Sequence, residues 1–126
     1  MASRLSEVYK QKPALKPLIT KIKADKGRIR GKIHLIWLIG SFAKGTATPQ
    51  SDTDLLIVQY EDNLEDWKTE LRNTFPNIKL QTHQLLHDKW EMIKAKESRF
   101  YQGVIEEKDH IEIIWNLTSK TFPKKR

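Results

Sequence analysis

The chain has 126 residues, 38% of them hydrophobic and 31% charged, with a formal net charge of +7 and no cysteine. This length suits one domain with a single core, and the lack of cysteine excludes disulfides and thiolate zinc sites. No apolar run approaches the roughly 20 residues of a membrane helix and the N-terminus lacks the apolar stretch of a secretory signal, so we expect a cytoplasmic protein without membrane association.

Two helices are predicted at the N-terminus. A short one covers roughly Ser3 to Gln11. Pro13 and Pro17 then break and restart the chain, because proline is tolerated only in the first turn of a helix. Apolar residues at helical spacing extend the second helix to about Lys26 or Arg30. Two glycines are expected to end it: Gly27 and Gly31.

The excess positive charge lies on this N-terminal quarter. Residues 1–32 hold ten Lys or Arg and two acidic residues, whereas residues 33–126 hold 13 basic and 14 acidic ones. Such asymmetry suggests a polyanionic partner, such as RNA bound through basic residues 10–32. A solvated, lysine-rich helix explains the same pattern equally well.

Two strands follow, joined by a short connection. Lys32 to Ile39 is a nearly continuous apolar run that predicts a central strand buried on both faces. Asp54 to Tyr60 predicts the second strand. Only Phe42 to Ser51 lies between them beyond a Gly40-Ser41 turn, and a parallel return needs about a dozen residues or more. We therefore expect an antiparallel pair, with Gly40 and Ser41 close to the start of the second strand.

The remaining chain continues the alternation of helix and strand. Asn63 is the predicted N-cap of a helix whose buried stripe includes Trp67, and a further helix is expected near Asp88. Strands are predicted over Ile78 to Leu86 and His110 to Leu117. The fold class is α/β, with a small mixed sheet of about four strands flanked by helices. The predicted division of this single domain is an N-terminal basic helical extension (1–32), an α/β core (33–117) and a basic tail (118–126).

The segment between the first two strands carries the residues suited to binding a polyphosphate. Glycine at a strand end lets the backbone approach a ligand and frees its amides for phosphate oxygens. Two aspartates alternate around Thr53, which puts both carboxylates on one face, where they repel each other unless a cation lies between them. Hard oxygen ligands suit Mg²⁺ or Mn²⁺ rather than zinc. The residues are Gly40, Ser41, Lys44, Gly45, Asp52 and Asp54.

This combination resembles the signature of the minimal nucleotidyltransferases of the DNA polymerase beta superfamily. That signature has Gly-Ser at a strand end, a basic residue and a glycine, then Ser-Asp-x-Asp-Leu. The resemblance is tight over residues 38–58 and extends through the order of elements to about residue 115. It implies the polymerase beta-like nucleotidyltransferase fold.

The resemblance also implies a reaction. Gly40, Ser41, Lys44, Gly45 and Ser51 would bind ATP or another nucleoside triphosphate. Asp52 and Asp54 would be the catalytic carboxylates and hold Mg²⁺ (or Mn²⁺). A nucleoside monophosphate, AMP in the first instance, would pass to a hydroxyl of a protein or RNA. Family members of this size often serve as the antitoxin of a helical HEPN toxin, which makes such a protein a candidate partner.

The sequence departs from the family pattern at two places. Lysine replaces the usual arginine at Lys44, which keeps the charge but loses the bidentate fork. The third carboxylate, expected on the third strand, is missing: Gln81 stands in its place, with His83 on the same face. These two residues form a tentative third-strand site.

Two other interpretations stay open. Without a third acid, the domain could bind nucleotide and metal yet act only by binding a partner. Alternatively, it could bind nucleic acid through its basic N-terminal helices. The sequence does not give the oligomeric state.

Overall fold

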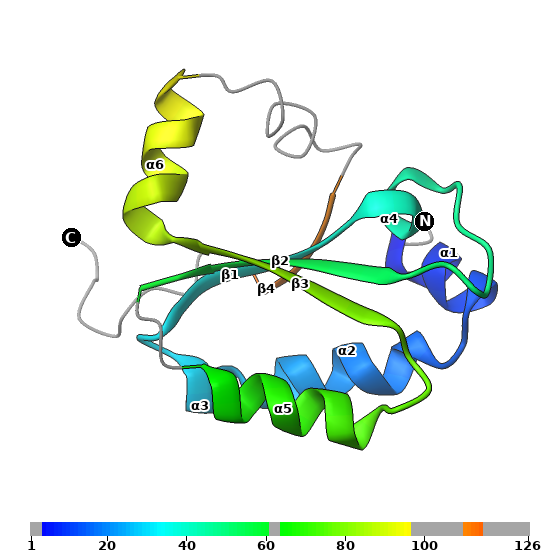
Figure 1. Ribbon diagram of the computed structural model, residues 1–126. Coiled ribbons are helices and arrows are strands. Elements are labelled where there is room, and N and C mark those ends of the chain that lie inside the picture. The colour runs from blue at the N-terminus through cyan, green and yellow to red at the C-terminus, as the bar shows by residue number, and fades with distance from the viewer. Residues whose placement is uncertain (1–3, 61–63, 97–109, 115–126) are drawn as a thin grey trace.

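The computed structural model describes residues 4–60, 64–96 and 110–114. These residues form a four-stranded sheet with helices around it (Figure 1), as the sequence predicts. Among them, no helix is both long and apolar enough to cross a membrane. The elements in chain order are α1 (Arg4–Gln11), α2 (Leu15–Ala24), α3 (Lys26–Ile29), β1 (Ile33–Ile39), α4 (Gly40–Lys44), β2 (Thr53–Gln59), α5 (Glu65–Thr74), β3 (Leu80–Leu86), α6 (His87–Lys96) and β4 (Ile111–Ile114).

The sheet is mixed and has the strand order β3-β2-β1-β4. β1 and β2 are antiparallel, which confirms the prediction made from their short connection. β2 and β3 are parallel, and α5 supplies the crossover that a parallel pair requires. β4 pairs antiparallel with the other side of β1. The two central strands are therefore β1 and β2, and both are buried along almost their whole length.

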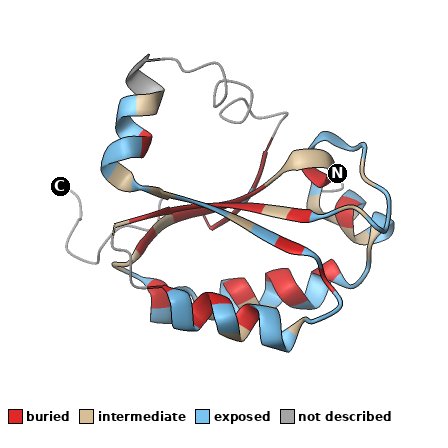
Figure 2. Cartoon of the chain, viewed as in Figure 1, coloured by how far each residue is buried: buried red, intermediate tan, exposed pale blue. Residues whose placement is uncertain are grey.

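Helices cover the two faces of the sheet unequally. α2, α3 and α5 lie along one face, whereas α6 lies over part of the other (Figure 1), and the buried residues of α2 and α5 point toward the sheet (Figure 2). The large core lies between the sheet and α2 with α5. A smaller core on the opposite face holds Trp37 of β1 and Trp90 of α6, whose rings meet edge to face at 5.4 Å.

The second predicted helix is divided in two. α2 ends at Ala24, and α3 follows after Asp25, whose backbone leaves the helical region at ψ 4°. Gly31 has a φ of +86°, a conformation that suits glycine, and it follows α3 as predicted. The prediction for Gly27 is wrong, because Gly27 lies within α3 and has no positive φ.

Some predicted boundaries move by one to three residues. α5 begins at Glu65 with Leu64 as its N-cap and no side-chain cap hydrogen bond; the predicted N-cap, Asn63, lies outside the described residues. β3 begins at Leu80 rather than Ile78, although Ile78 is buried. The described part of the last strand is residues 111–114, and the predicted continuation to residue 117 lies outside the described residues.

Candidate active site

The segment after β1 turns sharply into a short helix. Gly40 has a φ of +75° and begins α4, which ends at Lys44 and is capped by Gly45 with a φ of +81°. Ser41 accepts a backbone hydrogen bond from Thr46 at 3.0 Å, which closes the C-terminal end of this helix. The sequence predicted a turn and a glycine-containing loop here, and the structure adds one helical turn between the two glycines. Lys44 and Gly45 are exposed at its end.

Gly40 and Asp54 lie in direct contact. Ile39 and Asp54 are paired in the antiparallel ladder, so the end of β1 meets the start of β2. A Cβ atom built on Gly40 would lie 2.4 Å from Asp54 Oδ2, so any other residue here would have to displace the Asp54 carboxylate. Glycine suits this position because of its positive φ and because it has no Cβ to displace Asp54. The predicted proximity of the Gly-Ser turn to Asp54 is confirmed.

Asp54 and its neighbours alternate across the sheet. Asp54 shares a face with Leu56, which belongs to the small core with Trp90, because strand side chains alternate. Thr53 points to the large core and is 1% exposed. Asp52 immediately precedes β2 and is exposed, while the Asp54 side chain is 24% exposed.

Ser51 shapes the turn that delivers Asp52 to the strand. Its Oγ accepts a hydrogen bond from the Thr48 amide at 2.9 Å, and its own amide donates to the Thr48 carbonyl at 3.0 Å. This reciprocal pair fixes the backbone before Asp52, in the manner of local serine–backbone turns. The Ser51 hydroxyl thus has a local structural partner in addition to its predicted place in the site.

The third strand brings both predicted residues beside Asp54. Gln81 is the register partner of Asp54 in the parallel pair. Two residues on, His83 places Nε2 3.4 Å from Asp54 Oδ1. Gln81 and His83 are both exposed. The intervening Thr82 points the other way, where its hydroxyl accepts a hydrogen bond from Arg72 of α5 at 3.2 Å.

The described residues do not form a closed metal cage. No three His, Asp or Glu side chains in residues 4–60, 64–96 and 110–114 converge closely enough to hold a metal by themselves. Asp54 and His83 are in contact, but Asp52 stands at the open end of the strand. Any cation at this corner would complete its coordination with oxygens from water or a ligand.

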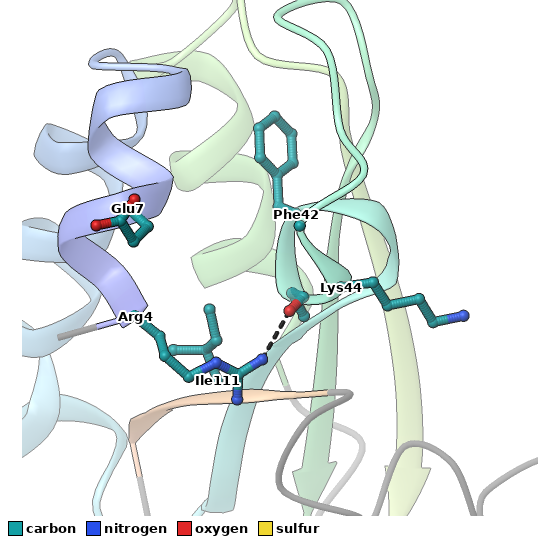
Figure 3. A pocket seen from close by; sticks show the side chains of 7 residues that line it. Arg4, Glu7, Phe42, Lys44 and Ile111 are labelled. Carbon is teal, nitrogen blue, oxygen red and sulfur yellow. Dashed lines mark hydrogen bonds between the residues drawn. The ribbon is translucent and has the colours of Figure 1, made fainter.

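The N-terminal helix contacts this segment, a contact that no sequence pattern predicts. Arg4 donates one hydrogen bond to the Ala43 carbonyl at 2.7 Å and another to the His110 carbonyl at 2.6 Å. A pocket of about 520 Å³ lies between α1, α4 and β4, and Arg4, Glu7 and Lys44 are among its lining residues. Figure 3 shows the Lys44 side chain extending away from Arg4 and Glu7.

Comparisons with known proteins bear on the family of the chain. No curated protein matches it. A solved structure described as "Crystal structure of the toxin-antitoxin with AMP-PNP" is 18% identical over 77% of this chain and 73% of that chain, with a TM-score of 0.47. The family model described as "Nucleotidyltransferase domain" matches residues 18–118, which include the whole site segment and the sheet. The chain therefore belongs to the nucleotidyltransferase domain family.

Proposed function

We propose that this nucleotidyltransferase domain transfers AMP from ATP to a hydroxyl of a protein or RNA acceptor, with release of pyrophosphate. The nucleotide would bind at the segment that joins β1 to β2. Asp52 and Asp54 are the proposed catalytic and metal-binding carboxylates. The proposed nucleotide-binding residues are Gly40, Ser41, Lys44, Gly45 and Ser51.

The contact between Gly40 and Asp54 is the observation that carries this proposal. It sets a carboxylate against the first residue of α4, where amide groups have no partners within the helix. A triphosphate at those amides would meet the negative charge of Asp54 at close range. Such an approach is favourable only with a cation between the two anions. The geometry thus supports a nucleotide and a divalent cation binding together.

The donor set fits Mg²⁺ or Mn²⁺. Asp52 and Asp54 offer hard carboxylate oxygens, and Mg²⁺ is commonly bound by one or two carboxylates together with water and substrate phosphates. When bound, the cation would supply charge neutralisation at the transferring phosphoryl group. His83 beside Asp54 is the proposed positioning group, since its Nε2 lies 3.4 Å from the carboxylate that it would orient.

The chain's other site residues would orient the triphosphate. Lys44 ends a short helix and its amine is exposed, so it can follow a phosphate oxygen as a mobile charge. Ser41 is half-buried at the start of the same helix. Donors fixed in advance where charge develops are the main source of rate in such transfers.

The test begins with binding and then measures transfer. ATP with MgCl₂ should raise the melting temperature of the full chain, and label from [α-³²P]ATP should pass to an acceptor. Asp54→Asn should lose both effects. Asp66→Asn is the matched control, because Asp66 is an exposed aspartate in the first turn of α5, away from Gly40. A chain that shows no ATP-dependent thermal shift would contradict the proposal.

Gln81 favours a second candidate function, a nucleotide-binding module with little or no transfer activity. It pairs in register with Asp54, at the position where the family resemblance calls for a third carboxylate, and an amide cannot act as a base. ATP binding without transfer by the wild-type chain would support this candidate. Gln81→Asp should then restore transfer, whereas Gln84→Asp, on the opposite face of β3, should not.

The acceptor and the partner are proposed from the family resemblance. A helical toxin of the HEPN type is the candidate protein acceptor, and mass spectrometry of the mixed proteins would locate the added AMP. RNA is the alternative, because Lys16, Lys23 and Arg30 are exposed on the basic N-terminal quarter. RNA binding through these residues should weaken steeply with salt and with their neutralisation.

A further inference from the structure

The first helix makes long-range contacts with the segment that carries the proposed nucleotide-binding residues. Arg4 donates to the Ala43 carbonyl at 2.7 Å (Figure 3). Gln11 Nε2 donates to the Ala47 carbonyl at 2.6 Å, and Lys12 Nζ donates to the Pro49 carbonyl at 2.9 Å. All three donors are side chains of residues 4–12, and all three acceptors are backbone carbonyls of residues 43–49. The family match begins only at residue 18, so this helix lies outside it.

Among the described residues, the segment's other backbone hydrogen bonds outside regular elements are local, from Thr46 to Ser41 and from Ser51 to Thr48. Ala43 lies in the last turn of α4, where carbonyls have no partner within the helix. A cation there also suits the negative end of the helix dipole. The side chains of residues 4–12 therefore supply distant anchor points that the segment does not provide for itself.

The helix is itself anchored to the core, so it can act as a support. Val8 is 4% exposed and belongs to the large core. The other terminal nitrogen of the Arg4 guanidinium donates a hydrogen bond to the carbonyl of His110, immediately before β4, at 2.6 Å. A single guanidinium thus joins α1, α4 and the edge of the sheet. Its planar fork suits this double contact better than an ammonium group does.

Polar contacts add to apolar packing where the helix meets the segment, since Val8, Phe42 and Ala43 share the large core and Ala47 packs against it. Two pockets, of about 520 and 290 Å³, lie along their junction, and Glu7, Phe42 and Gly45 line both. Apolar packing is therefore incomplete here, although Phe42 is buried in the large core. Loss of the side-chain hydrogen bonds should free residues 43–51 without opening the core.

We infer that Arg4, Gln11 and Lys12 are positioning residues that hold residues 43–51 in the conformation that binds the triphosphate. The inference rests on the proposed function in one respect, namely that Lys44, Gly45 and Ser51 contact the nucleotide. A segment fixed before binding loses less conformational entropy when the ligand arrives. The support should consequently raise nucleotide affinity while leaving the turnover of the bound complex unchanged.

Hydrogen exchange of the nucleotide-free full chain tests the support itself. Arg4→Ala, Gln11→Ala and Lys12→Ala should each speed exchange in residues 43–51 by about threefold to tenfold. Exchange in β1 and β2 should stay unchanged. Lys10→Ala is the matched control, since Lys10 is exposed on the same helix and pairs with Glu7 of that helix. Because Gln11 is exposed, Gln11→Ala should fold even if Arg4→Ala does not.

Nucleotide binding and kinetics test the positioning role. In calorimetry with ATP and MgCl₂, the same three variants should bind about threefold to tenfold more weakly than Lys10→Ala. KM for ATP should rise by the same factor with kcat unchanged. Arg4→Lys should recover part of the loss, because an ammonium group can reach only one of the two carbonyls.

The outcomes separate this inference from the proposed function. If Arg4→Ala, Gln11→Ala and Lys12→Ala exchange the amides of residues 43–51 no faster than Lys10→Ala does, the inference is overturned, whatever the ATP affinity. Faster exchange with unchanged ATP affinity would overturn the positioning role. A wild-type chain that binds no ATP would overturn the proposed function and the positioning role with it, while the exchange data would still decide whether α1 supports the segment.

Discussion

Gly40 and Gly31 share a backbone conformation but differ in their surroundings. Their φ angles are +75° and +86°; a Cβ on Gly40 would strike Asp54, whereas a Cβ on Gly31 would meet nothing within 4 Å. Alanine at either position should cost about 1–2 kcal/mol of stability for the left-handed backbone. Only Gly40→Ala should also displace Asp54 and lose ATP binding. Urea denaturation and calorimetry would measure the two effects, and equal ATP affinity in both variants would refute the steric argument.

Thr53, the spacer between the two aspartates, carries a buried hydroxyl. Its Oγ1 has no hydrogen-bond partner among the described residues, and the residue is 1% exposed. A buried, unpaired polar group costs about 1–3 kcal/mol, so Thr53→Val, which keeps the shape, should stabilise the domain by about 1 kcal/mol or more. Thr82→Val should give no such gain, because Thr82 accepts a hydrogen bond from Arg72. A lower urea midpoint for Thr53→Val would show that the hydroxyl has a partner.

At the scale of elements, a charged network fastens α5 to the two helices beside it. Glu70 of α5 accepts hydrogen bonds from Arg28 of α3 at 2.8 and 3.0 Å and from Lys21 of α2 at 2.7 Å. Trp67, one turn earlier, donates to Asp25 at 2.8 Å. The hydrogen bonds from Arg28, followed by those from Lys21, lower the pKa of Glu70 from 4.5 to about 2.

This shift predicts how the network responds to acid. Because the folded-state pKa lies below the unfolded value, the ionised carboxylate stabilises the fold above about pH 4.5, and this contribution is lost as pH falls toward 2. Glu70→Gln should therefore melt at a lower temperature than wild type at pH 6. This difference in melting temperature should disappear near pH 2. Asp66→Asn, an exposed change on the same helix, should show no such trend. Since these side chains are partly exposed, added salt should also narrow the difference between Glu70→Gln and wild type.

The elements differ in how far the sequence could predict them. β1 and β2 were predictable because long apolar runs leave few alternatives to buried strands. α4 was not, because a helix of five residues, the first of them a glycine, is too short to show helical periodicity. The break at Asp25 was missed for a related reason: the apolar spacing of α2 continues to Ile29, so the pattern runs through the interruption.

At the scale of the whole molecule, the geometry of the candidate site was most predictable where a short connection joins its parts. A short connection brings Gly40 to Asp54, and chain length alone implies that contact. The sequence suggested Gln81 and His83, but their distances to Asp54 depend on the register of a parallel pair across a crossover. The contact from Arg4 to Ala43 spans 39 residues and has no local signal at all.

The sheet also predicts where the molecule opens last. Within the part of the chain that the structure describes, β1 and β2 have a strand on each side, whereas β3 pairs with β2 alone and is largely exposed. Amides of the two central strands should exchange only through global unfolding. Leu71→Ala, at a fully buried position of the large core, should lower the free energy of unfolding by about 2–5 kcal/mol.

Native-state hydrogen exchange of that variant makes the prediction quantitative. The opening free energies of Ile36 and Ile57, register partners in β1 and β2, should fall by the full amount measured in urea. The opening free energies of the β3 amides should fall by less, because local opening of an edge strand leaves the core around Leu71 intact. Equal losses in β3 and in the central strands would mean that the sheet opens as one unit. The parallel pair that carries Gln81 and His83 past Asp54 would then be as rigid as the antiparallel pair that carries Gly40.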